Sequence, residues 1–276
     1  MEATLWQRLD EIITRTVRPM AERCDEESLF CGESVRALAD AGFMGLPYPP
    51  EQGGRGSSYE SYVRCVERLS KACPSVGVTY ATHVGLACHP LHAFGSPMQK
   101  ESFLRPMLRG DKLGAFALTE PEAGSDVGAI ATTAELDGGR LGIAAQAVGI
   151  ADAAFDEACV RLKERRQFGR TLEHFQGLRW KAADMWAKVE AARQLTLYAA
   201  RLRDGGKRFR AEASAAKLVA SEAAVWCASE AVQICGGSGY LQGSVAERLY
   251  RDAKITQIYE GTSEVQRMVI AFGFLG

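Results

Sequence analysis

Apolar side chains recur every three to four residues along most of the chain, which is the pattern of amphipathic helices. The spacing predicts helices over residues 4–24, 32–41, 57–71, 76–86, 98–109, 140–166, 172–204 and 209–235, and a last short helix near Ser263. The three longest segments are rich in Ala, Leu, Glu, Arg and Lys, which are strong helix formers. Segment 209–235 carries many small residues, so a neighbouring helix can approach it closely, and we expect it inside a bundle.

Two Pro/Gly-rich stretches interrupt this helical pattern. "GLPYPPEQGGRGSS" follows the helix stop at Gly42 and predicts a loop, because no helix or strand persists through such a composition. "KLGAFALTEPEAGSD" (112–126) opens with a short apolar, strand-like piece and closes as a loop. Strand signals are otherwise few, so the sequence predicts an all-α fold.

Composition narrows the classes of function. The 276 residues are 47% apolar and 24% charged, with a net charge of −1, so no basic surface for nucleic acid is expected. Apolar runs stay below the ~18 residues that a membrane span needs. The eight cysteines form no CxxC pair, and the N-terminal segment lacks the basic start and apolar run of a secretory signal. We therefore expect a cytoplasmic protein, or a mitochondrial matrix protein if the source is eukaryotic.

The "CHPLH" run (Cys88, His89 and His92) is a candidate metal site. No second cluster of ligands accompanies it, and we interpret these residues as ordinary helix and loop side chains. No metal is expected.

Three stretches carry chemistry that is ambiguous when each is taken alone. "LTEPEAGSD" (118–126) offers backbone N–H groups and hydroxyls that could bind a planar ring, or it is a surface turn. "KERRQFGR" (163–170) offers guanidinium groups suited to phosphate, or it is a solvated basic helix end. "QICGGSGY" (233–240) lets a backbone approach a phosphate closely, or it is a plain helix stop.

A fourth stretch, "QIYEGTSEVQ" (257–266), precedes the last helix. Ser263 and Gln266 fit a capping box that would start this helix. The capping box does not explain why Tyr259 and Glu260 stand outside the helix.

Taken together and in order, these stretches resemble the acyl-CoA dehydrogenase family. The matching pieces are "GLPYPPEQGGRG", "ALTEPEAGSDVGAI", "LDGGRLGIAAQAVGIADAA", "KERRQFGR", "AVQICGGSGY" and "RDAKITQIYEGTSEVQR". The family fold has an N-terminal helical domain, a middle β domain and a C-terminal four-helix bundle. Here "TTAEL" runs straight into "DGGRLGIAAQ", where the family places its β domain. The resemblance therefore implies an N-terminal helical domain (1–135) packed on a helical bundle (136–276), with the β domain absent.

The resemblance implies a flavoenzyme that binds FAD and oxidises an acyl-CoA thioester to the trans-2-enoyl-CoA. It also implies an electron-transfer flavoprotein as partner and assembly into a homodimer or homotetramer. Glu260 matches the family's catalytic base; some branches place the base instead at the position that Gly139 holds here. A carboxylate can remove the proton alpha to a thioester carbonyl if burial raises its pKa.

Further residues match the family's binding positions. For the cofactor they are Thr119, Arg165, Phe168, Gln233, Gly237, Thr262 and Glu264; for the substrate they are Ser125, Asp137, Arg140, Tyr259 and Gly261. In the family, Arg165 and Phe168 would meet the FAD of a partner subunit, and Gln233 and Gly237 match the other half of that shared site. The missing β domain leaves a second hypothesis open, namely a non-catalytic helical scaffold or subunit derived from the family.

Overall fold

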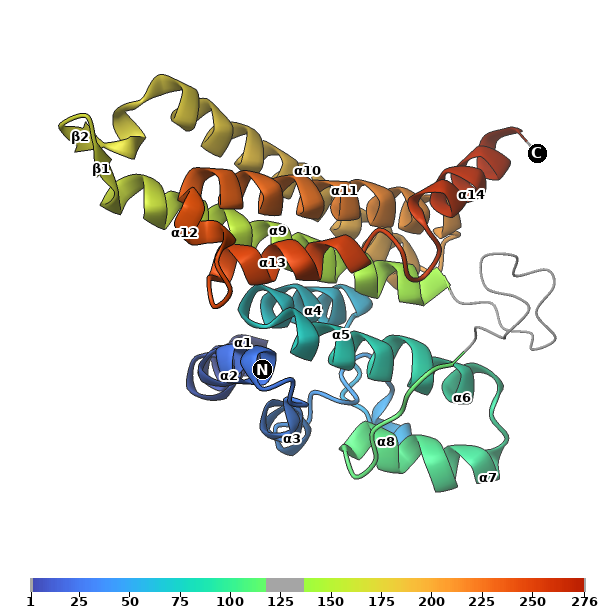
Figure 1. Cartoon of the computed structure of the whole chain (residues 1–276). Helices are drawn as coiled ribbons and strands as arrows, with labels where there is room; N and C mark the ends of the chain where they lie inside the picture. The colour runs from blue at the N-terminus through green and yellow to red at the C-terminus, as the bar shows by residue number, and fades with distance from the viewer. Residues whose placement is uncertain (1, 118–136, 276) are drawn as a thin grey trace.

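The computed structural model describes residues 2–117 and 137–275, with side chains from residue 4 and again from residue 138 (Figure 1). The helices of the first segment are α1 (Glu2–Ile12), α2 (Arg18–Glu26), α3 (Gly32–Asp40), α4 (Tyr59–Ala72), α5 (Pro74–Ala81), α6 (Cys88–Phe94), α7 (Pro97–Gln99) and α8 (Arg105–Arg109). π-Helical turns at Ile13–Val17, Thr82–Ala87 and Lys100–Leu104 join several of these, and a 3₁₀ turn covers Pro50–Gln52.

The second segment contains the longer helices. It comprises α9 (Asp137–Glu164), the strands β1 (Arg166–Gln167) and β2 (Arg170–Thr171), a 3₁₀ turn (Leu172–His174), α10 (Gln176–Asp204), α11 (Arg210–Cys235), α12 (Gly237–Tyr240), α13 (Val245–Ile255) and α14 (Ser263–Leu275). The two strands form one antiparallel hairpin. In the described residues helices dominate, which confirms the all-α prediction.

Helices α9, α10, α11 and α13 lie together as a bundle (Figure 1). α11 lies in the centre of the bundle. Its small buried side chains let α9 approach closely; they include Ala213, Ala216, Ala220 and Ala224. α11 is also long and apolar enough to cross a membrane by length and composition, properties that the core helix of a bundle shares.

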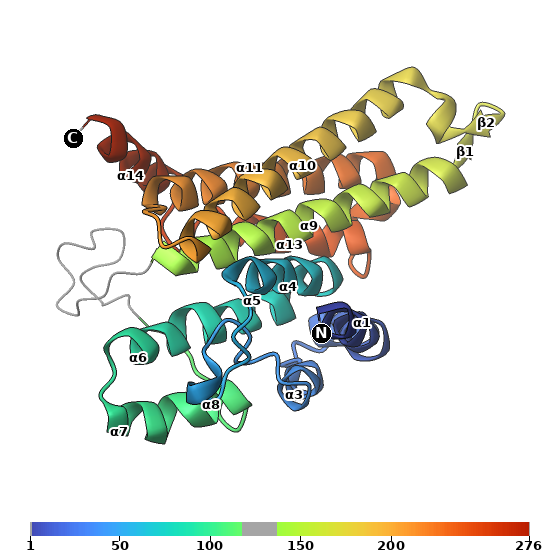
Figure 2. The ribbon, with the colours of Figure 1, turned by 180° about the vertical axis from the view of Figure 1, so that it is seen from behind.

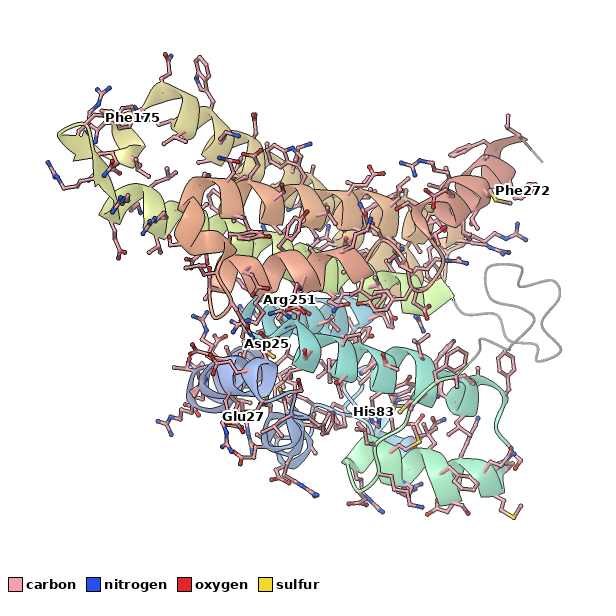
Figure 3. The ribbon with its side chains drawn as sticks, viewed as in Figure 1. Asp25, Glu27, His83, Phe175, Arg251 and Phe272 are labelled. Carbon is pink, nitrogen blue, oxygen red and sulfur yellow. The ribbon has the colours of Figure 1, made fainter. Side chains whose placement is uncertain are left out.

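The helices before residue 117 pack under the bundle through α4 and α5, which lie against α9 (Figure 2). A half-buried ion-pair group crosses this contact: the Arg193 guanidinium on α10 lies 2.7 Å from the Glu67 carboxylate on α4 and 3.0 Å from Asp152 on α9. A second ion pair joins α13 to α2, where Arg251 donates to Asp25 at 2.6 Å (Figure 3).

The boundary between an N-terminal domain (1–135) and a helical bundle (136–276) stays a prediction.

Three local predictions were wrong. Residues 113–117 form no strand, because within the described chain they have no second strand to share backbone hydrogen bonds with; the Gly114 N–H donates instead to His83 Nδ1 at 2.9 Å. α13 lies in a stretch for which we predicted no helix. The end of the "KERRQFGR" segment is a hairpin rather than a helix end, with Phe168 and Gly169 at positive φ in its two-residue turn.

Candidate active site

Glu260 lies in the tight turn between α13 and α14, in a backbone conformation unusual for its type. Its φ is +56°, and that of Gly261 is +87°, so two consecutive residues are left-handed. Glycine adopts this conformation freely, but for glutamate it costs roughly 1–2 kcal/mol. Such strain persists only where surrounding contacts enforce it, and it concentrates at functional sites.

Two buried side chains hold this turn. The Lys217 Nζ on α11 donates to the Gly261 carbonyl at 2.7 Å. The Gln266 Nε2 on α14 donates to the carbonyls of Glu260 at 3.0 Å and Gly261 at 2.9 Å. Both side chains are fully buried. The turn is therefore fixed from two helices at once.

The Glu260 carboxylate lies directly over Gly139, in the first turn of α9. A Cβ at Gly139 would overlap Glu260 Oε2, and it would also come within 2.6 Å of Leu86 Cδ2. Gly139 is therefore the residue that leaves room for the carboxylate. The two positions that the sequence analysis considers for a base, 139 and 260, are neighbours in space here, and one of them carries an acid.

Burial raises the pKa of the Glu260 carboxyl above its usual range, while the cationic groups of Arg140 and Lys217 nearby oppose that rise. Burial also lowers the pKa of Lys217, to about 8, against the opposing charges of Glu260 and Glu264. A half-buried carboxylate with a raised pKa and adjacent cations is suited to accept a proton near neutral pH.

Two further predicted residues, Tyr259 and Thr262, lie in the same turn, and a third, Glu264, lies at the start of α14. The Tyr259 hydroxyl donates to Gln146 Oε1 on α9, and burial raises the pKa of Tyr259. The Thr262 Oγ1 accepts the N–H of Val265 at 3.4 Å, whereas Glu264 is exposed. Backbone and Thr262 hydrogen bonds lower the pKa of Glu264.

The predicted capping box at Ser263 and Gln266 was wrong. Ser263 is the first residue of α14, and its buried Oγ has no hydrogen-bond partner within the described residues. Thr262 takes the capping position instead. The Gln266 side chain donates to the carbonyls of the left-handed turn, so it stabilises the turn that carries Glu260 and does not cap α14.

Four predicted cofactor residues lie at the opposite end of the bundle. Phe168 is 92% exposed at the hairpin tip, next to the exposed Arg165, which directly follows α9. Gln233 and Gly237 are exposed at the end of α11 and the start of α12, and Gln233 lines an open cavity of about 790 Å³. The 28 residues of α9 span about 40 Å, so these four residues are far from Glu260 (Figure 1).

Of the remaining predicted residues, the structure describes Arg140. Arg140 follows Gly139 on α9 and lies close enough to affect the charge of Glu260. Thr119 and Ser125 lie outside the described residues, as does the side chain of Asp137 at the start of α9.

Sequence reasoning missed Lys217, which makes one of the hydrogen bonds that hold the turn. Its signal was available: it is the one charged residue in the "ASAAKLVAS" run of α11. A lone cation among small residues on a helix that must be buried needs a partner, and here that partner is the carbonyl of Gly261, which is 44 residues further along the chain.

A half-buried carboxylate held in a strained turn of a helical bundle is a candidate general base. Comparison with known proteins identifies the family. The profile of the acyl-CoA dehydrogenase N-terminal domain matches residues 2–111, and that of the acyl-CoA dehydrogenase C-terminal domain matches residues 126–275. The chain belongs to the acyl-CoA dehydrogenase family.

Individual relatives agree with this result. The short-chain specific acyl-CoA dehydrogenase of Clostridium acetobutylicum is 34% identical, with 96% of this chain and 95% of the relative covered. Butyryl-CoA dehydrogenase from Megasphaera elsdenii has a similar structure, with a TM-score of 0.93, 31% identity, and 99% and 98% of the two chains covered. A chain from a study of the electron transferring flavoprotein of Acidaminococcus fermentans reaches a TM-score of 0.94 at 31% identity, with 99% and 97% covered.

The comparison also shows what this chain lacks. The alignment with the Clostridium acetobutylicum enzyme extends over 361 positions, whereas this chain has 276 residues. A missing middle region, predicted from the direct join of "TTAEL" to "DGGRL", fits this difference.

Proposed function

We propose that this protein catalyses the flavin-dependent α,β-dehydrogenation of an acyl-CoA thioester to the trans-2-enoyl-CoA, with Glu260 as the base. The observation that supports it most is the placement of the Glu260 carboxylate, presented from a strained turn over Gly139. The carboxylate would accept the proton alpha to the thioester carbonyl. The raised pKa of Glu260 makes its carboxylate a stronger base, and a stronger base removes a weakly acidic proton more readily.

Arg140 and Lys217 would keep the carboxylate ionised before the reaction. Their positive charges favour the anion at a half-buried position where burial disfavours it. The balance of the two effects favours a carboxylate that is a stronger base than an exposed one.

The chemistry of the exposed residues fits FAD, which would supply the acceptor for the β hydride when bound. Arg165 offers a guanidinium suited to a diphosphate, and the exposed ring of Phe168 offers a face for an adenine. Thr262 and Glu264 lie beside the Glu260 turn at the other end of the bundle. Because about 40 Å of α9 separates the two groups, we propose that they serve two different FAD molecules in a homodimer, or in a homotetramer built from such dimers.

We propose a short-chain acyl-CoA as substrate and an electron-transfer flavoprotein as the acceptor of the electrons. The short-chain specificity of the relative from Clostridium acetobutylicum supports the first. The study of the Acidaminococcus fermentans electron transferring flavoprotein, which contains a similar chain, supports the second.

The difference in length from the relatives favours one alternative, a non-catalytic helical scaffold or subunit. The variant Glu260→Gln separates the two functions, because it removes the base and keeps the shape. We expect the purified protein with FAD to form enoyl-CoA from butyryl-CoA, and the variant to be slower by roughly 10³-fold or more. Glu222→Gln, an exposed acid on α11, is the matched control and should retain the activity. Equal product formation by Glu260→Gln and the unchanged protein contradicts the assignment of the base.

A further inference from the structure

Lys217 is a buried charged side chain that no substrate or cofactor position of the sequence analysis includes. It is 0% exposed, and its neighbours on the same face of α11 are small, namely Ala213, Ser214, Ala220 and Ser221. A buried ammonium group costs much free energy unless it is hydrogen-bonded and its charge is balanced. The hydrogen bond and the charges around Lys217 must therefore compensate the cost of its burial.

The contacts of Lys217 all concern the turn that carries Glu260. Among the described residues, the Gly261 carbonyl is the hydrogen-bond acceptor of Nζ, at 2.7 Å. The negative charges that act on it are Glu260, in the turn, and Glu264, at the start of α14, while Arg140 on α9 acts in the opposite sense. The ammonium group thus contacts the backbone of the turn and faces its carboxylate.

The turn needs such a contact because its conformation is unfavourable for glutamate. Gln266 also donates to the Gly261 carbonyl, and to that of Glu260, but it is neutral and lies on α14, which starts directly after the turn. Lys217 belongs to α11 in the centre of the bundle. It therefore fixes the turn to the centre of the bundle, while the Tyr259 hydroxyl fixes it to Gln146 on α9, the helix on which Gly139 makes room for the carboxylate.

We propose that Lys217 is a positioning residue of the reaction: its ammonium group holds the Glu260–Gly261 turn in its left-handed conformation and keeps the Glu260 carboxylate ionised over Gly139. This inference rests on the proposed function, since it assigns to Lys217 a role toward the base. It adds a residue that acts through Glu260 and touches no substrate.

Two variants test this role. Lys217→Met keeps the length of the side chain and removes both the charge and the donor, whereas Lys217→Arg keeps both. In the FAD-reconstituted protein we expect Lys217→Met to lower kcat roughly tenfold or more with little change in KM, and Lys217→Arg to recover part of the rate. The pH at which the rate falls to half should move upward in Lys217→Met, because a cation that favoured the Glu260 anion is gone.

The matched control is Lys254→Met. Lys254 is exposed on α13 and donates to the Gln257 side chain at 2.8 Å, so it borders the same segment without contacting the turn carbonyls. We expect its rate and pH profile to match those of the unchanged protein. A purely structural role of Lys217 would lower the yield or the melting temperature and leave the pH profile in place.

A second measurement separates this inference from the proposed function. The ionisation of Glu260 is followed by carbon NMR of labelled glutamate carboxyls, with the signal assigned by its loss in Glu260→Gln. If the protein forms no enoyl-CoA, the proposed function fails, and the NMR titration still reports on Lys217. An unchanged Glu260 titration in Lys217→Met overturns the inference, as does a rate loss without any shift in the pH profile. If Lys217→Met does not fold, Lys217→Gln is titrated in its place under the same criteria.

Discussion

At the scale of single residues, the position of the Glu260 carboxylate depends on the absence of a side chain at Gly139. The carboxylate occupies space that any side chain at 139 would take, since a Cβ there overlaps Glu260 Oε2 and crowds Leu86. A base at either position would therefore reach much the same place.

Gly139→Ala tests this dependence. The added methyl group should displace the carboxylate, and a misplacement of about 1 Å can cost roughly 10²-fold in rate. We expect kcat to fall by about ten- to hundredfold while the protein stays folded, as measured by enoyl-CoA formation and circular dichroism. Gly177→Ala is the control, because no atom lies within 4 Å of a Cβ built at that helical glycine. An unaffected Gly139→Ala would mean that the carboxylate works from elsewhere.

At the scale of elements, α13 carries a half-buried acid, Asp252, that the proposed reaction does not use. Burial raises the pKa of Asp252 to about 6, against the opposing charges of Arg251 and Arg248. The raised folded-state pKa means that ionisation favours the unfolded chain. The resulting loss of stability is absent below the ordinary value of 3.8, grows as the pH rises, and is complete above about 6.

Asp252→Asn should therefore stabilise the protein at neutral pH and much less under acid conditions. We expect a gain of roughly 1–3 kcal/mol at about pH 7.5 and a smaller gain at about pH 4.5, from the size of the pKa shift. Urea unfolding of both proteins at the two pH values measures the difference. The same gain at both pH values would show that the charge of Asp252 is not its cause.

The helices were largely predictable from the sequence, because apolar spacing decides them locally. The long helices α9, α10 and α11 lie close to the predicted segments 140–166, 172–204 and 209–235. α13 has its buried Ala246, Leu249 and Ala253 at helical spacing too, so its signal was present in the sequence and was overlooked. The strand expected at residues 112–117 depends on a partner strand, which no local pattern can supply.

At the scale of the whole molecule, the candidate site could be predicted only in part. Glu260 was found because its motif is continuous in sequence. Lys217, Gln146 and Gly139 reach the same turn from other helices, and their contacts arise only when the chain folds. The separation of Arg165 and Phe168 from Glu260 is likewise a property of the fold, set by the length of α9.

This separation makes assembly part of the proposed function. One chain offers the turn with Glu260 at one end of the bundle and the exposed Arg165 and Phe168 at the other. Under the proposed function, a complete FAD site would be built from residues of two chains. Exposed apolar side chains near both ends, including Phe168 and Phe272 on α14, are available for such contacts (Figure 3).

The most direct test of the central claim is the absorbance of the FAD-reconstituted protein between roughly 350 and 500 nm, followed under anaerobic conditions after addition of butyryl-CoA. We predict that this flavin absorbance bleaches in the unchanged protein and persists in Glu260→Gln, which binds the same cofactor but lacks the base. Failure of the protein to retain FAD, or equal bleaching in both proteins, would contradict the account.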